Sequence, residues 1–334
     1  MEPWKLCTYS VTSLRGGRGM SIITKPDIAS NLASVLQDPD IAWLGKERGT
    51  PLVPATEESF KVQDIPGKGA GVVATERIAK GQVVMVELPL VIRIGDPSPW
   101  NRPGALQVVQ QAAKGLVKDD QNRLLQMARQ GRGYILDDIF KTNAFHISVE
   151  GISHTALYPE IARMNHACVT RYSSRTLTME IMAYEDVEPG EELTISYLPM
   201  NLPYKQRQQL ISEWGFACTC SLCRDKKGRA VSDQRRTQVR DILEFLGHPE
   251  NVTRAKVNSK VAEIEAIAEQ EGMTAQLGDM LHLVAERIEA AKNIELAEEI
   301  GKKALEAQRY YTGYDSTRAE EVVEFIQRVK RAIE

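Results

Sequence analysis

Four of the five cysteines of the chain lie in one stretch, from Met164 to Cys223. Cys218, Cys220 and Cys223 form a Cys-x-Cys-x2-Cys pattern, and Cys168 stands well upstream beside a histidine. A tight group of thiolates with one distant thiolate is typical of a structural zinc ion that joins two segments. Clustered rather than paired cysteines also favour a reducing compartment. The sequence therefore predicts one zinc ion on these four residues.

Polar residues that could bind a ligand or take part in catalysis lie close to the cysteines. Asn165 and His166 come just before the upstream cysteine, and Tyr197 ends a predicted strand that follows the turn Glu188–Glu191. A strand tyrosine alone is usually a packing residue, but its place between this turn and the cysteine cluster favours a functional role. Farther upstream, the glycine run Gly67–Gly71 allows close approach of the backbone to another chain segment or to a ligand.

The surrounding patterns predict a mixed fold of strands and helices. Short alternating segments and turn residues predict strands over residues 56–95 and 143–200. β-Branched residues follow the glycine run, which excludes the dinucleotide-binding fingerprint, because there a helix begins at the third glycine. Helical spacing of apolar residues predicts a helical insert over about 97–142. From Ser232 onward the same spacing predicts antiparallel helices of tetratricopeptide-like size. Near the N-terminus, Met20–Thr24 is expected to be a strand followed by a helix.

Composition excludes several classes of function. Charged residues make up 26% and hydrophobic residues 43% of the 334-residue chain, as in an ordinary globular protein. The net charge of -3 gives no general attraction to nucleic acid, so direct nucleic-acid binding is not expected. No apolar run is long enough to span a bilayer, and charges interrupt the N-terminal region, so no membrane association is expected. The expected compartment is the cytoplasm or the nucleus.

Four motifs in one order carry a resemblance to a known family. They are Gly67–Gly71, Asn165–Cys168, Gly190–Glu192 with Ile195–Tyr197, and Phe216 with the cysteine cluster. Together they resemble the motifs of SET-domain protein lysine methyltransferases. The helical insert and the helical tail resemble the MYND-SET subfamily without its MYND zinc finger. The motifs cover roughly residues 58–225 of the chain.

The resemblance implies a role for each matching residue. The implied S-adenosylmethionine site consists of Lys68, Gly69, Ala70, Asn143, Asn165, His166, Tyr197, Trp214 and Phe216. The implied channel for the substrate lysine consists of Phe145, Tyr197 and Trp214, and Tyr197 is the catalytic candidate at the point where the methyl group passes. The implied zinc ligands are Cys168, Cys218, Cys220 and Cys223.

The resemblance also implies an organisation and a reaction. The expected α+β chain has an N-terminal segment, a SET-type β domain with its helical insert, a zinc-bound post-SET segment and an all-helical domain. Their expected ranges are 1–55, 56–200, 201–228 and 229–334. The implied reaction is in-line methyl transfer from a sulfonium to a neutral lysine amine, which requires alignment and exclusion of water. A tyrosine hydroxyl and backbone carbonyls can orient the two reacting groups.

Two departures from the family pattern leave other functions open. Val169-Thr170-Arg171 stands where many members carry x-Pro-Asn, and Trp214 occupies a position that often carries a second channel tyrosine. The first hypothesis is a methyltransferase acting on an exposed lysine of a histone or another protein. The second is a degenerate cofactor binder that acts as a scaffold and binds a protein partner on the C-terminal helices. The third is an enzyme that uses the same pocket on a small molecule.

Overall fold

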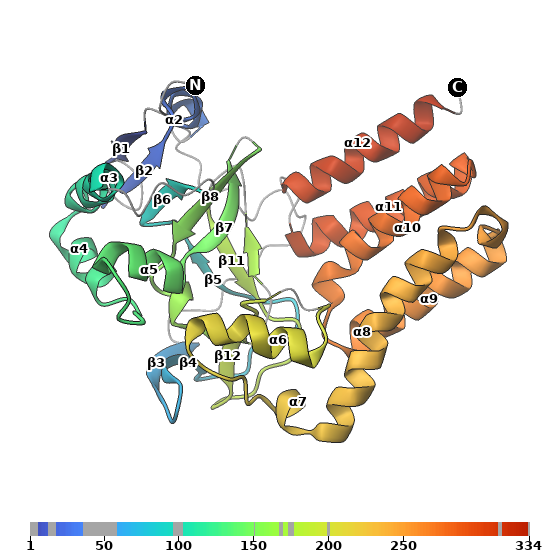
Figure 1. The fold of residues 1–334 in the computed structure, drawn as a ribbon, viewed down its shortest axis with the longest axis horizontal. Coiled ribbons are helices and arrows are strands. Elements are labelled where there is room, and N and C mark those ends of the chain that lie inside the picture. Colours follow the sequence, from blue (N-terminus) through green and yellow to red (C-terminus); the bar gives the residue numbers. More distant parts are fainter. Residues whose placement is uncertain are drawn as a thin grey trace. The chain divides into compact units, whose positions relative to one another are not determined.

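The computed structural model describes residues 6–12, 18–35, 59–95, 103–149, 151–166, 170–172, 177–198, 201–312 and 316–332. The chain divides into two compact units, Met1–Ile195 and Ser196–Glu334. Figure 1 shows short strands and a helical insert in the first unit, and helices in the second. This mixture of short strands and helical layers confirms the predicted fold class. None of the helices in the described ranges combines the length and apolar character needed to cross a membrane.

The largest sheet of the first unit has five strands. Its spatial order is β1 (Cys7–Val11), β2 (Met20–Thr24), β6 (Val91–Ile94), β8 (Ile152–Leu157) and β7 (Phe145–Val149). Only the pairing of β2 with β6 is parallel among these neighbours. The β2 strand is buried along its whole length, as expected for a run of β-branched residues inside a sheet. The predicted strand at Met20–Thr24 is therefore confirmed, as is the helix after it, α2 (Pro26–Val35).

The first unit has two smaller sheets, and one of them positions candidate site residues. One contains β10 (Thr170–Tyr172), β11 (Met179–Met182) and β5 (Val83–Glu87). The other contains, in spatial order, β3 (Phe60–Ile65), β4 (Gly69–Ala74), β12 (Glu192–Ile195) and β9 (Asn165–His166). Because β9 pairs in parallel with β12, residues far apart in sequence lie next to the hairpin of β3 and β4. This second sheet brings together the glycine run and the Asn-His motif.

The helical insert of the first unit consists of three helices. They are α3 (Pro103–Lys114), α4 (Lys118–Leu125) and α5 (Ile135–Asn143), and they confirm the predicted helical character of this region. Apolar side chains from all three helices join those of β6 and β8 in one core cluster, whose buried members include Val109, Leu124, Ile139, Phe140 and Leu157. The insert is therefore packed against the five-stranded sheet.

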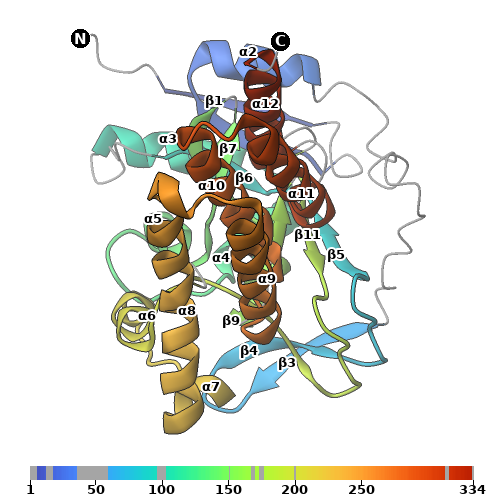
Figure 2. The ribbon, with the colours of Figure 1, turned by 90° about the vertical axis from the view of Figure 1, so that its right-hand side faces the viewer.

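The second unit is helical in the described residues. It begins with α6 (Tyr204–Ile211), the 3-10 turn η3 (Ser212–Trp214) and α7 (Ser221–Arg224). The helical tail follows as α8 (Lys226–Leu246), α9 (Arg254–Gln270), α10 (Leu277–Ala290), α11 (Ile294–Thr312) and α12 (Thr317–Arg331), seen in Figure 2. The short 3-10 turns η4 (Pro249–Asn251) and η5 (Thr274–Gln276) lie between them.

The caps and core of the tail follow from its sequence pattern. The Thr253 side chain caps α9, and Ser316 caps α12 by accepting a hydrogen bond from the Ala319 backbone. The predicted apolar faces form one buried cluster that includes Val239, Ile264, Leu281, Ile300 and Phe325. The antiparallel helical layer that helical spacing predicted is therefore present in this unit.

Candidate functional site

The glycine run forms a tight turn between β3 and β4. The Lys68 backbone N–H donates to the Ile65 carbonyl over 2.9 Å, which closes the turn. Gly67 and Gly69 both have a φ of 76°, in the left-handed region that favours glycine. No neighbouring atom lies within 4 Å of a Cβ built on either glycine. The need for glycine here is therefore conformational, and the turn presents open backbone.

Asn165 reaches this hairpin from the neighbouring strand β9. Its amide Nδ2 donates to the Ala70 carbonyl at 3.2 Å and to Glu192 Oε1 at 2.8 Å. The other carboxylate oxygen of Glu192 forms an ion pair with Lys68 Nζ. His166 follows Asn165 in β9 and stands opposite Ile195 in the parallel pairing. The structure thus brings together five residues of the predicted cofactor set, namely Lys68, Gly69, Ala70, Asn165 and His166.

A half-buried carboxylate supports the turn that leads into Asn165. Glu87, at the end of β5, accepts hydrogen bonds on Oε2 from the backbone N–H groups of Glu160 and Ile161, at 3.0 and 2.9 Å. The 3-10 turn η2 (Ile161–Arg163) starts there and ends just before Asn165. Burial raises the pKa of Glu87 to about 7, although the two backbone hydrogen bonds oppose this shift.

Asn143 and Phe145 lie in another part of the first unit. Asn143 is the last residue of α5, although the sequence had suggested that a strand begins there. Its side-chain amide nitrogen donates to the carbonyls of Ala128 and Ile139, both at 2.7 Å. Oδ1 is the other polar atom of this side chain. The Phe145 ring, at the start of β7, makes an edge contact with Tyr158 at 5.8 Å between centroids. The cofactor and channel roles of Asn143 and Phe145 remain predictions.

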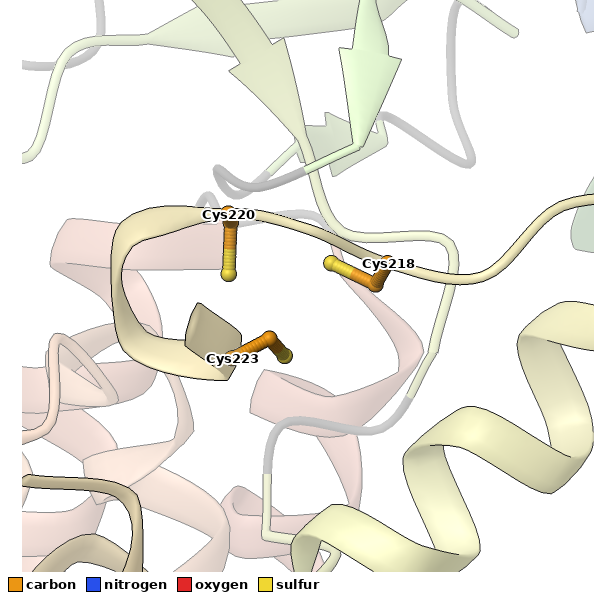
Figure 3. Close-up of side chains that lie close together, drawn as sticks. All are labelled: Cys218, Cys220 and Cys223. Carbon is orange, nitrogen blue, oxygen red and sulfur yellow. The ribbon is translucent and has the colours of Figure 1, made fainter. Parts of the chain in front are cut away.

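Three cysteines of the second unit converge, as Figure 3 shows. The sulfur atoms of Cys218, Cys220 and Cys223 all lie within 4.8 Å of one another. Three sulfurs at about 2.3 Å from one tetrahedral zinc would lie about 3.8 Å apart, so this arrangement suits a zinc ion. The predicted fourth ligand, Cys168, falls outside the described residues.

The charges within this cysteine cluster also favour a cation. Hydrogen bonds with the thiols of Cys218 and Cys223 lower the pKa of Cys220, whereas hydrogen bonding within the cluster raises the pKa of the other two cysteines. Hydrogen bonding within the cluster therefore favours the thiolate form of Cys220 and the protonated forms of its two neighbours. A divalent cation would replace the two protons and balance the added negative charge. The donor set thus fits zinc.

The amide of Gln208, on α6, fixes the backbone at the start of the cluster. Its Nε2 donates to the Cys218 carbonyl at 2.9 Å, and its Oε1 accepts from the Cys218 N–H at 3.1 Å. Both peptide groups of this cysteine are therefore paired with one side chain. The cluster continues into α7, where the Arg224 N–H donates to the Cys220 carbonyl at 3.0 Å.

The remaining candidate residues also belong to the second unit. The rings of Tyr197 and Trp214 lie 5.7 Å apart between centroids and are inclined at 40°. Gly215, with a φ of 83°, ends the 3-10 turn that carries Trp214. The next residue, Phe216, is 42% exposed. The structure brings Tyr197 and Trp214 together, and the roles of all three aromatic residues remain predictions.

Comparison with known proteins identifies the domain that holds these motifs. The SET domain family matches residues 69–198, a range that begins within the glycine turn, at Gly69, and contains Asn165, Glu192 and Tyr197. Residues 69–198 form a SET domain. The three cysteines that converge, together with Trp214 and Phe216, follow this SET domain in the chain.

Curated relatives of the chain are named as lysine methyltransferases. Histone-lysine N-methyltransferase set5 of Schizosaccharomyces pombe is 29% identical over 196 residues, which is 56% of this chain and 57% of that protein. Human N-lysine methyltransferase SMYD2 is 30% identical over 162 residues, 42% of this chain and 37% of SMYD2. Histone-lysine N-methyltransferase ATXR2 of Arabidopsis thaliana is 40% identical over 75 residues, 21% of this chain and 16% of ATXR2. The alignments thus cover less than two thirds of each relative.

Glu192 is a site residue that sequence reasoning missed. It belonged to the Gly190–Glu192 motif, but two glutamates stand side by side there and the sequence does not say which one faces Asn165. The register of β12 shows that Glu192 is the one. Thr194 pairs with Asn165, and Glu192, two residues before Thr194, lies on the same face of the strand. Only the pairing of β9 with β12, which the sequence did not predict, carries this information.

Proposed function

We propose that the protein is an S-adenosylmethionine-dependent protein-lysine N-methyltransferase. The observation that carries the proposal is the SET domain whose glycine turn is joined to Asn165 and whose strand β12 leads directly to Tyr197. The names of the curated relatives support the same reaction. The proposed substrate is a histone or another protein with an exposed lysine. Because the three clustered cysteines are free thiols, the proposed compartment is the cytoplasm or the nucleus.

The glycine turn could bind such a cofactor through its backbone groups. Its left-handed residues leave backbone groups open to a ligand, and Asn165 and His166 lie at its side. When bound, S-adenosylmethionine would supply a methyl group on a sulfonium, whose carbon a neutral amine can attack in line while the carbon–sulfur bond breaks and S-adenosylhomocysteine leaves. Lys68, Gly69 and Ala70 would bind it through their backbone. Phe216 would contribute its exposed ring to the same ligand.

The side chains after β12 are suited to handle the substrate amine. The Tyr197 hydroxyl can accept a hydrogen bond from the amine and so hold its lone pair in a fixed direction. The indole of Trp214 packs beside this ring and would exclude water, which favours the neutral form of the lysine. The Phe145 ring is proposed for the same channel. Tyr197 is therefore the proposed catalytic residue.

A structural zinc ion completes the proposal. Cys218, Cys220 and Cys223 would supply three thiolates, and Cys168 is the proposed fourth ligand. The metal would act on folding rather than on the methyl group, because it would order the segment that carries Phe216. The C-terminal helices remain a proposed surface for a further protein partner.

The test is methyl transfer from labelled S-adenosylmethionine to histones and to a proteome extract. The parent protein should label lysine side chains, as mass spectrometry of the product would report. Tyr197→Phe keeps the ring but removes the hydroxyl, so turnover should fall about 10-fold or more while cofactor affinity stays within about 2-fold. Tyr204→Phe is the matched control, because Tyr204 also lies in the second unit and makes its cation–π contact through the ring.

The alternatives make different predictions in the same assay. A protein that binds the cofactor but labels no protein would be the degenerate binder that acts as a scaffold. Label on a small molecule of the extract, with none on protein, would point to the third hypothesis. Equal turnover of Tyr197→Phe and the parent would remove Tyr197 from the catalytic role.

A further inference from the structure

Glu192 connects two segments of the SET domain that sequence separates widely. It is the first residue of β12, which pairs with β4 on one side and with β9 on the other. One carboxylate oxygen accepts from Asn165 Nδ2 at 2.8 Å, and the other pairs with Lys68 Nζ. The Glu192 side chain is 18% exposed, whereas the Lys68 side chain is 44% exposed. A single carboxylate therefore joins the glycine turn to the Asn-His strand.

This contact fixes the orientation of the Asn165 amide. Its two partners, the Ala70 carbonyl and the Glu192 carboxylate, both accept hydrogen bonds and cannot donate them. Both amide hydrogens of Asn165 are thus taken, and Nδ2 must face the hairpin. The carbonyl oxygen Oδ1 then points away from these two acceptors. Without the carboxylate, one hydrogen would lose its acceptor and the opposite amide orientation would compete.

Gly71 leaves the space that this arrangement needs. A Cβ at this position would lie 2.9 Å from Asn165 Nδ2 and 3.1 Å from Glu192 Oε1. It would also lie 2.5 Å from the Ile65 side chain. Any larger residue would push the amide and the carboxylate away from β4. The third glycine of the run therefore serves the contact between Asn165 and Glu192, not the turn itself.

We propose that Glu192 is a positioning residue of the cofactor site, which orients Asn165 so that its Oδ1 accepts from an N–H group of the bound cofactor. The ion pair with Lys68 holds the glycine turn against the same carboxylate. This inference rests on the proposed function, because it assigns Glu192 a role in binding S-adenosylmethionine. Glu192 itself needs no contact with the ligand.

Calorimetric titration with S-adenosylhomocysteine tests the assignment on the 334-residue chain. Glu192→Ala removes both contacts and should weaken binding about 10-fold. Glu192→Gln keeps an acceptor for Asn165 and loses only the ion pair with Lys68, so it should weaken binding about 2-fold to 3-fold. Glu191→Ala and Glu191→Gln are matched controls and should bind like the parent. Glu191 is the adjacent carboxylate, and its side chain accepts from the Glu188 backbone in the turn instead.

Two cofactor analogues separate positioning from general destabilisation. One lacks the amino group of the amino-acid part, and the other lacks the amino group of adenine. The parent should bind one of them more weakly than S-adenosylhomocysteine, since Asn165 Oδ1 would lose its donor. Glu192→Ala should discriminate less between that analogue and S-adenosylhomocysteine. A purely structural role would weaken all three ligands by the same factor and would overturn the assignment.

A double-mutant cycle covers the case in which Glu192→Ala does not fold. Lys68→Met removes the other partner of the ion pair, so the double variant with Glu192→Gln should bind like Glu192→Gln alone. Additive losses in affinity would overturn the assignment. If the parent, Glu192→Ala and Glu192→Gln all bind S-adenosylhomocysteine with the same affinity, the assignment is overturned and the proposed function stays intact. A parent that binds no cofactor would overturn both.

Discussion

Replacing Glu87 by glutamine should change how the stability of the SET domain depends on pH. The Glu87 carboxyl lies under the turn that precedes Asn165 and accepts from the backbone N–H groups of Glu160 and Ile161. Burial raises its pKa from 4.5 to about 7, the nearby Glu160 carboxylate raises it further, and Arg123 opposes both. The Glu87→Gln side chain would keep a carbonyl oxygen for the two N–H groups but could not ionise. The substitution therefore imitates the protonated acid at every pH.

The sign and size of the effect follow from linkage. Below pH 4.5 the carboxyl is protonated in both the folded and the unfolded chain, and its favourable contribution is complete. Between pH 4.5 and about 7 the unfolded chain releases the proton first, so stability falls as pH rises. The difference between these pKa values corresponds to about 3.4 kcal/mol at most. Because Glu87 is only half-buried, we expect solvent screening to reduce this to about 1–2 kcal/mol.

Urea-dependent hydrogen exchange on peptides that cover Val83–Glu87 would measure the free energy of unfolding of the first unit alone. Relative to the parent, Glu87→Gln should gain about 1–2 kcal/mol of unfolding free energy between pH 5 and pH 8. Glu185→Gln, which removes the same charge at an exposed position, should show a constant difference from the parent. If the Glu87→Gln difference is equally constant, Glu87 is ionised throughout and the argument from burial is wrong.

Three further predictions concern the second unit. Cys220→Ser should leave the protein without zinc by elemental analysis, and a full zinc content would contradict the ligand assignment. Gln208→Ala removes both hydrogen bonds to the Cys218 backbone, so a chelator should compete for zinc about 10-fold more effectively. The control Gln209→Ala, on the exposed side of α6, should hold zinc as tightly as the parent. Trp214→Tyr adds a hydroxyl beside Tyr197 and should change the number of methyl groups per lysine by mass spectrometry, whereas an unchanged product would place Trp214 outside the channel.

Several elements that the sequence predicted have an uninterrupted apolar pattern. The strands Gly69–Ala74 and Val83–Glu87 and the tail helices are of this kind, and the structure contains them. The individual strands β6 and β8 were missed because polar residues interrupt them. Arg93 in β6 is buried against Asp137, and His154 in β8 is buried with its ring bonded to Thr24 at 2.9 Å. Partners that are distant in sequence make these positions acceptable inside a sheet, and no local pattern reveals such partners.

The candidate site divides in the same way between local and distant information. The resemblance to the SET family implied that Asn165 and the glycine turn belong to one cofactor site, and the Cys-x-Cys-x2-Cys spacing predicted that the three clustered cysteines lie near one another. They did not reveal the Gln208 contact with Cys218 or the Glu87 support of the turn before Asn165. Each of these contacts joins a side chain to a backbone group of another segment. A backbone group has the same chemistry at any residue, so it leaves no trace in the sequence.

The register of β12 couples the stability of the SET domain to its site. Leu193 and Ile195 are buried, while Glu192 and Thr194 alternate with them and are half-buried on the other face. A slip of one residue would place Glu192 on the buried face and Leu193 beside Asn165. The cost of burying an unpaired carboxylate opposes that slip, as does the loss of two core side chains. The contacts that orient Asn165 and the apolar contacts that hold the strand therefore select the same register.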